Sequence, residues 1–203
     1  MTTINCHVCR DRIVVVTDGG FTHLDHRFIQ KITDVPAGLS KTVVLPHLQC
    51  VVAARGPIAI TMWLPWFASY FSSLPEMKEK LSDRLRKGCG GLLFRLFPKL
   101  FACEFFVAGY HERKPIAFWI SSKEGWETCD IPDFLVAPDI STENLPPVNA
   151  HEARTIDRQA TARMLSLLNR QRDEFGPAAV SGPCQMTQIF PSGDILTRII
   201  TKF

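Results

Sequence analysis

The strongest constraint on the fold is a pair of short β-rich runs near the N-terminus. Residues 2–9 and 12–17 are rich in β-branched side chains, and Arg10-Asp11 between them has the composition of a tight turn. The second run continues into Asp18-Gly19-Gly20, a sequence typical of a strand end, because glycine adopts turn conformations freely. The sequence therefore begins with a predicted antiparallel hairpin.

The rest of the chain alternates between groups of strands and helices. Helical patterns cover 58–71, 76–87 and 150–172, and the proline-rich stretch 131–148 is expected to form a loop or lid. The order predicts an α+β fold, a four-layer αββα sandwich in which helices cover two stacked, mostly antiparallel sheets. Further strand patterns lie at 43–45, 50–54, 104–110, 115–121, 126–129, 184–190 and 195–200.

Composition narrows the class of protein. The 203 residues, 46% of them hydrophobic, suit one compact domain covering 1–203. A net charge of +3 gives no argument for nucleic acid. The N-terminus has no signal-peptide pattern, and the longest apolar run, 57–71, is interrupted by Pro65 and is too short to span a bilayer. We expect a cytoplasmic protein.

Seven cysteines, an odd number, lie mostly within apolar strand patterns, which favours reduced, buried thiols. Cys6-His7-Val8-Cys9 has the spacing of a redox or zinc motif, but no second such pair follows. The alternative, which we favour, is a single strand in which His7 faces away from Cys6 and Val8.

The segment 92–101 combines leucine and phenylalanine with basic residues. Such a composition suits either a membrane surface or burial against a neighbouring subunit. The glycines at 88, 90 and 91 interrupt any long amphipathic helix, which favours the subunit contact.

Thr2 carries the chemistry that the N-terminus offers. If Met1 is removed, the α-carbon of Thr2 bears a free amine, and the adjacent β-carbon bears the hydroxyl. An α-amine has a pKa of about 8, so near neutral pH it can accept the proton of the hydroxyl. The residue then supplies both a nucleophile and a base.

Four short segments in this order resemble the N-terminal nucleophile (Ntn) hydrolases, above all β-type proteasome subunits and the bacterial proteasome-like peptidase that works with an unfoldase ring. The likeness covers nearly the whole chain. Its segments are Thr2-Thr3-Ile4 with Thr17-Asp18-Gly19, Lys41-Thr42-Val43-Val44-Leu45 with Ala54-Arg55-Gly56, Val107-Ala108-Gly109-Tyr110 with the strand that follows, and Ser181-Gly182 with Gly193-Asp194.

The resemblance implies a role for five residues. Thr2 would be the nucleophile and its amine the base, with Asp18 orienting Lys41. The charge of Lys41 would disfavour protonation of that amine. The backbone N–H of Gly56 would help stabilise the oxyanion, and Ser181 would form a hydrogen bond near the terminal amine. A specificity pocket would lie near Gly20 and Arg55.

Two hypotheses follow. One is a threonine-type peptidase or amidohydrolase acting on peptides or proteins, without cofactor or metal, in a homo-oligomeric ring with an unfoldase as candidate partner. The other is a catalytically inactive proteasome-like scaffold or binding subunit. It is suggested by Ala178, where the family has Asp, and by 134–139, which lacks the family's serine. Lys31 is an alternative to Lys41 as the lysine that Asp18 orients. Neither hypothesis involves nucleic acid or a membrane.

Overall fold

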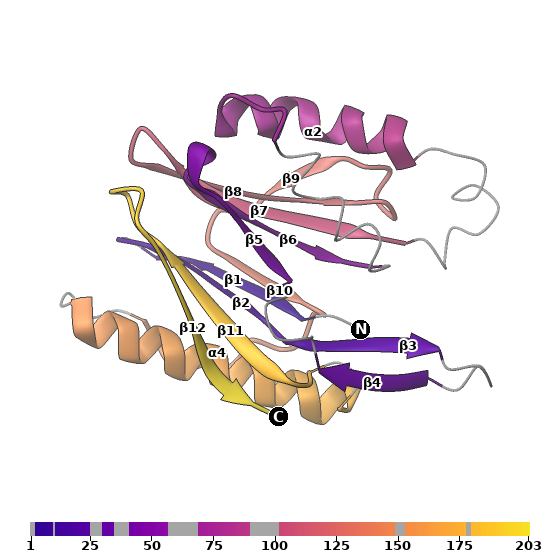
Figure 1. Cartoon of the computed structure of the whole chain (residues 1–203). Coiled ribbons are helices and arrows are strands. Elements are labelled where there is room, and N and C mark those ends of the chain that lie inside the picture. Colours follow the sequence, from indigo (N-terminus) through magenta and orange to yellow (C-terminus); the bar gives the residue numbers. More distant parts are fainter. Residues whose placement is uncertain are drawn as a thin grey trace.

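The structure, a computed structural model, describes residues 3–9, 11–24, 30–34, 41–56, 69–89, 102–148, 153–177 and 180–203. Within these ranges two five-stranded antiparallel sheets lie face to face, and a helix covers the outer face of each (Figure 1). The predicted α+β class and the sandwich of two sheets between helices are confirmed.

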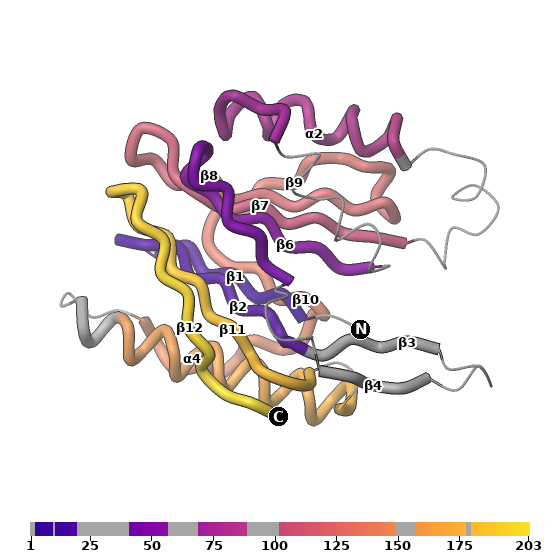
Figure 2. Tube along the Cα trace, viewed as in Figure 1, coloured from indigo at the N-terminus to yellow at the C-terminus, as the bar shows by residue number. Residues whose placement is uncertain are grey.

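The first sheet is assembled from three distant parts of the chain. Its strand order is β10–β1–β2–β11–β12, and every neighbouring pair is antiparallel. The indigo N-terminal strands therefore lie beside the yellow C-terminal hairpin (Figure 2). The strands are β1 (Ile4–Val8), β2 (Ile13–Thr17), β10 (Phe134–Ala137), β11 (Pro183–Ile189) and β12 (Ile195–Lys202).

The second sheet follows the chain in the order β5–β6–β7–β8–β9. The β7–β8 hairpin turns through two residues with positive φ, Glu112 and Arg113, at the turn that the sequence predicts. Its strands are β5 (Thr42–Leu45), β6 (Cys50–Arg55), β7 (Glu104–His111), β8 (Lys114–Ser121) and β9 (Thr128–Asp130), with a short 3₁₀ turn, η1 (Pro46–Leu48), between the first two.

Helix α2 (Leu74–Cys89) covers the second sheet. Its first turn is capped reciprocally, because the N–H of Glu76 donates to Ser73 Oγ at 3.3 Å and the Glu76 carboxylate accepts from the N–H of Ser72 at 3.0 Å. The spacing of its apolar residues places one stripe against the sheet. That stripe consists of Leu74, Met77, Leu81 and Leu85, all buried.

Helix α4 (Ala153–Phe175) covers the first sheet, on the opposite outer face (Figure 1). Ala160, Met164, Leu167 and Leu168 form its buried stripe, as the helical period of the sequence predicts. They pack against Val14 and Val16 of β2, among others.

Alternation along the strands produces three apolar layers. Side chains of β1 and β2 that face the other sheet form the middle layer with residues of β6 and β7, whereas their neighbours face α4. The middle layer includes Ile4, Cys6, Ile13, Val15, Val51, Ala53, Phe106 and Ala108. A strand buried on both faces tolerates no shift of register, since every side chain would change layers.

The structure corrects two expectations. The stretch 131–148 is not entirely a loop, because β10 within it pairs with β1. The sequence patterns contain no strands between residues 18 and 42, but β3 (Gly20–Leu24) and β4 (Gln30–Asp34) form a separate antiparallel pair there. Most of the predicted helix 58–71 and all of the segment 92–101 lie outside the described residues. None of the helices described is long and apolar enough to cross a membrane.

Truncating the α2 stripe should destabilise the fold strongly. Leu81 is completely buried, so Leu81→Ala removes apolar contacts and leaves a cavity, which costs about 2–5 kcal/mol. Leu196 on β12 is 60% exposed, and Leu196→Ala should change the free energy of unfolding by less than about 0.5 kcal/mol. Urea unfolding of both variants measures the difference, and equal losses would contradict this packing.

The buried thiols predict a loss of stability at alkaline pH. Burial raises the pKa of Cys50 from its ordinary value of 9.0 to about 12. Above pH 9 the unfolded chain releases this proton while the folded chain keeps it, so the free energy of unfolding falls as pH rises, by up to about 1.4 kcal/mol per pH unit. Cys50→Ala should have a shallower fall between pH 9 and 10.5 in denaturant titrations, and an unchanged slope would refute the assignment.

Candidate functional site

Strand ends of both sheets meet at one edge of the sandwich, among them the start of β11, because Gln185 pairs with Thr17 at the end of β2. The registers pair Ile4 with both Thr17 and Ala137 in the first sheet, and Glu104 with both Arg55 and Ser121 in the second. β5 begins at the same edge, because Thr42 pairs with Ala53 near the end of β6. The first described residue, Thr3, lies immediately before β1 at this edge. Four of the five residues implicated by the sequence flank these strand ends.

Asp18 and Lys41 form a buried ion pair at this edge. Asp18 follows β2 and Lys41 precedes β5, so the pair links the two sheets. The ammonium Nζ lies 3.0 Å from each carboxylate oxygen, and the backbone N–H of Thr3 donates to Asp18 Oδ1 at 2.7 Å. Both side chains are at most 1% exposed. The predicted partnership of Asp18 with Lys41, 23 residues apart, is therefore formed.

Lys31, the rival lysine, lies in β4, where it pairs with His23. The β3–β4 hairpin occupies part of the interval between Asp18 and Lys41. The sequence favours Lys41 over Lys31, because the residues that follow Lys31 do not fit the strand pattern that follows Lys41. The fold agrees with this preference, since Lys41 rather than Lys31 forms the ion pair with Asp18.

Burial dominates the electrostatics of Lys41. Removal of the ammonium from water lowers its pKa below the ordinary value of 10.5, although the Asp18 carboxylate opposes this shift. The positive charge of Arg55 lowers the pKa further. Arg55 ends β6, immediately before Gly56, so the candidate oxyanion donor lies next to a group that acts on Lys41.

Ser181 is held against the same segment. The N–H of Gly19 donates to the carbonyl of Ser181 at 3.1 Å, and Ser181 is 7% exposed. Gly19 has no room for a side chain, since a Cβ there would lie 2.3 Å from the carbonyl oxygen of Pro183. The resemblance implies that Asp18 and Ser181 belong to one site, and this backbone contact brings together the two segments that contain them.

The turn that contains Ser181 is braced from both sides. Gly182 and Phe203 exchange two backbone hydrogen bonds, of 3.3 and 3.1 Å. Arg172 of α4 donates to the carbonyl of Val180 at 2.7 Å, and its guanidinium lies 5.0 Å from the centre of the Phe203 ring. These braces were not foreseen, because no local sequence pattern links residues 172, 182 and 203.

Gly56, the candidate oxyanion donor, immediately follows β6 in the second sheet. Its φ is +133°, a conformation that favours glycine, and a Cβ would lie 2.8 Å from Ala102 O and Cys103 Cβ. Glycine is therefore required here by the backbone alone. Thr2, the fifth predicted residue, lies outside the described residues.

The Cys6–Cys9 motif covers the last three residues of β1 and the residue that follows it. Cys6 is buried in the layer between the sheets, while His7 lies on the other face, with its ring edge against Phe134. Cys9 Sγ is 3.4 Å from His7 Nδ1. The alternation predicted for this segment is confirmed. No three His, Cys, Asp or Glu side chains in the described ranges are grouped so as to hold a metal ion.

No family model matches the sequence. No curated protein matches it either. Among solved structures, an Anbu (Gly-1) mutant from Hyphomicrobium sp. strain MC1 has a similar fold, with a TM-score of 0.66 and 15% sequence identity. The match covers 99% of this chain and 87% of that one. Anbu is a bacterial proteasome-like Ntn hydrolase, so the fold that the sequence resemblance implied is confirmed.

Separating the buried ion pair should be costly. Lys41→Met leaves the Asp18 carboxylate buried without its cation, which typically costs about 3–5 kcal/mol. Adding Asp18→Asn should recover much of the loss, because the amide oxygen still accepts from Thr3. Denaturant unfolding of both single variants and the double variant measures the coupling.

Lys78 provides a matched control for this measurement. Its ion pair with Asp130 is 2.6 Å long, but the two side chains are 38% and 64% exposed. Lys78→Met should therefore cost less than about 1 kcal/mol. If Lys41→Met costs no more than Lys78→Met, Lys41 and Asp18 are not a buried pair.

Proposed function

We propose that the protein is a threonine-type peptidase of the Ntn hydrolase class, with Thr2 as its nucleophile once Met1 has been removed. One observation carries the proposal. The N–H of Thr3 donates to the carboxylate that holds the buried Lys41. Residue 2 is joined to that nitrogen by a single peptide bond, so its amine and hydroxyl are tethered to the ion pair.

The reaction divides into two steps. The Thr2 hydroxyl attacks the carbonyl carbon of the scissile amide while the Thr2 amine takes up the hydroxyl proton. The C–N bond then breaks, the proton passes to the leaving nitrogen, and an ester to Thr2 remains. Water attacks this ester with the same amine as base, which releases the carboxylic acid and restores the hydroxyl.

Lys41 and Asp18 act on this chemistry through charge. A cation beside the Thr2 amine favours the neutral amine, which is the form that accepts a proton. Asp18 keeps the ammonium in position through two contacts of 3.0 Å. The dry surroundings reduce screening, so the influence of the ammonium is stronger than it would be in water.

Gly56 and Ser181 complete the proposed site. The N–H of Gly56 would donate to the oxyanion that develops during attack, an interaction worth about 3–4 kcal/mol in comparable sites. Ser181 would hydrogen-bond near the Thr2 amine. Its carbonyl contact with Gly19, beside Asp18, supports a location close to the reacting groups.

Self-association into a closed ring belongs to the same proposal, with peptides or unfolded proteins as substrates and an unfoldase as candidate partner. The sequence resemblance to proteasome-like subunits, a family that forms closed rings, supports this part of the proposal. The inactive scaffold is the alternative. The end of β10 supports this alternative, because Ala137-Pro138-Asp139 occupies the position where proteasome-like Ntn hydrolases have a serine.

Removal of the Thr2 hydroxyl tests the mechanism directly. Thr2→Ala should lower peptide hydrolysis by at least about 10³-fold, because no other group replaces the nucleophile. Thr2→Ser keeps both hydroxyl and amine and should retain activity. Release of fluorophore from a mixed library of peptide amides measures both, with urea midpoints to show that folding is unchanged.

Intact mass and N-terminal sequencing separate the two hypotheses. Active protein should begin at Thr2 and should be labelled there by an electrophile that requires an adjacent amine and hydroxyl. Hydrolysis by protein that retains Met1, or full activity of Thr2→Ala, would rule out the mechanism. Folded protein that retains Met1 and hydrolyses nothing would establish the scaffold.

A further inference from the structure

A pocket opens between the two sheets at the edge where the strand ends meet. Its volume is about 460 Å³, within the range of sites that bind small molecules or side chains. The first sheet contributes Ile4 and residues 135–139, and the second contributes the ends of β6, β7 and β8. Because its lining comes from both sheets, the pocket continues the middle apolar layer outward.

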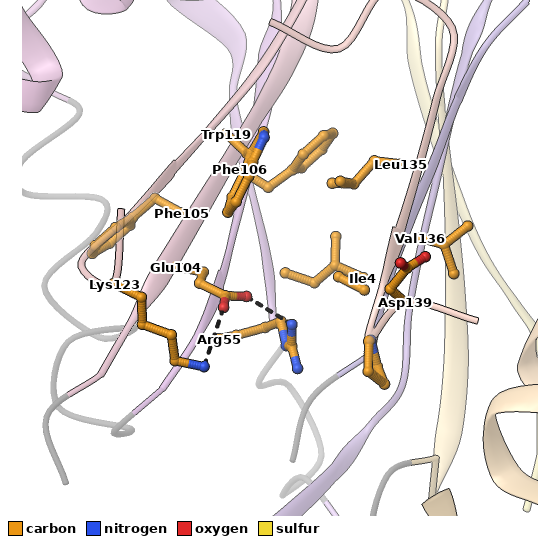
Figure 3. Close-up of a pocket in the computed structure, with 12 residues that line it drawn as sticks. Ile4, Arg55, Glu104, Phe105, Phe106, Trp119, Lys123, Leu135, Val136 and Asp139 are labelled. Atoms are coloured by element: carbon orange, nitrogen blue, oxygen red, sulfur yellow. Dashed lines mark hydrogen bonds and ion pairs between the residues drawn. The ribbon is translucent and has the colours of Figure 1, made fainter. Parts of the chain in front are cut away.

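The deep part of the pocket is apolar and aromatic. Phe106 and Trp119 are directly opposite each other on β7 and β8, and both face Leu135 and Ile4 across the space (Figure 3). Phe105 points the other way, toward the α2 layer, as alternation requires. Phe106 and Trp119 thus form one aromatic wall, and Ile4 and Leu135 form an aliphatic wall across from it. A flat ring fits between them, because it can stack on or meet the edge of either aromatic side chain.

The outer part of the pocket is charged. Glu104 pairs with Arg55 at 2.7 Å and with Lys123 at 3.8 Å, while the carboxylate of Asp139 lies on the opposite side (Figure 3). Two cations and two carboxylates balance, so this opening does not select a charged ligand. A guanidinium on one side and a carboxylate on the other instead suit a peptide unit, with its C=O toward Arg55 and its N–H toward Asp139.

The pocket and the buried ion pair lie on two sides of β1. In the first sheet β10 is on one side of β1 and β2 on the other. The pocket is lined from β10, whereas Asp18 follows β2. Ile4, the first residue of β1, lines the pocket, and Thr3 before it donates to Asp18. The pocket wall formed by Ile4 is therefore only two residues along the chain from Thr2, the proposed nucleophile.

We propose that this pocket binds the aromatic side chain of a peptide substrate, with the adjacent peptide unit between Arg55 and Asp139. The expected substrate preference in catalysis rests on the proposed function, whereas binding of the aromatic side chain does not require the protein to be active. A buried ring removes about 150–250 Å² of surface from water, and an alanine side chain gains far less. The enzyme should hence prefer phenylalanine over alanine at this subsite by roughly 10–100-fold in kcat/KM.

A thiol placed in the pocket tests binding without any turnover. Leu135→Cys should react with benzyl methanethiosulfonate, and N-acetyl-phenylalaninamide at saturation should slow that reaction by about fivefold or more. N-acetyl-alaninamide at the same concentration should not. Peptide mapping by mass spectrometry reads the modification at residue 135 alone. Leu145→Cys is the matched control, since Leu145 is also half-buried but packs in the α4 layer, and its labelling should be insensitive to either amide.

Two further measurements test whether an aromatic ring binds in this pocket. On the unsubstituted chain, saturation-transfer NMR should show the ring protons of N-acetyl-phenylalaninamide in contact with protein. Leu135→Trp should fill the pocket, abolish that signal and remove the preference for phenylalanine. Equal protection by both amides, or a ring signal that survives Leu135→Trp, would overturn the pocket. Protection by the aromatic amide in a protein that hydrolyses no peptide would support the pocket while refuting the proposed mechanism.

Discussion

The buried ion pair between Asp18 and Lys41 is the interaction on which the rest of the site depends. Burying two charges is costly, and the cost is offset only when the geometry is good and the remaining lone pairs are used. Here the ammonium contacts both carboxylate oxygens, and Thr3 supplies an additional N–H. The carboxylate therefore joins the end of β2, the start of β5 and the residue before β1. A substitution that disturbs this pair is therefore expected to affect all three strand ends.

The sandwich explains why such a pair occurs at its edge. In the interior, strand backbones satisfy one another and apolar side chains fill both faces, which leaves no space for reacting groups. At the strand ends the ladders stop, yet the packed sheets still exclude most water. Charges at this boundary are weakly screened and remain within reach of a substrate, a combination that favours both a perturbed lysine and a selective pocket.

The sequence predicts the features that depend on neighbouring residues and misses those that depend on distant ones. The hairpin of β7 and β8 follows from alternation and a short polar turn, and the α4 stripe follows from helical spacing. β10 is only four residues long, lies between prolines, and pairs with a strand some 130 residues earlier, so no local pattern marks it. The Arg55–Glu104 contact likewise arises from strand pairing across 49 residues. The partnership of Asp18 with Lys41 was predicted by resemblance to a family, not by spacing.

The position of β1 between the ion pair and the pocket links chemistry to selection. Thr3 and Ile4 are consecutive, and one contributes its N–H to Asp18 while the other forms a wall of the pocket. β1 is held on both sides by β10 and β2 and buried on both faces, so it cannot shift to suit one function independently of the other. A substrate whose side chain fills the pocket therefore fixes its backbone relative to the start of β1. In the proposed mechanism that is how binding energy would align the scissile carbonyl with the Thr2 hydroxyl, since a small displacement of the reacting atoms costs much of the rate.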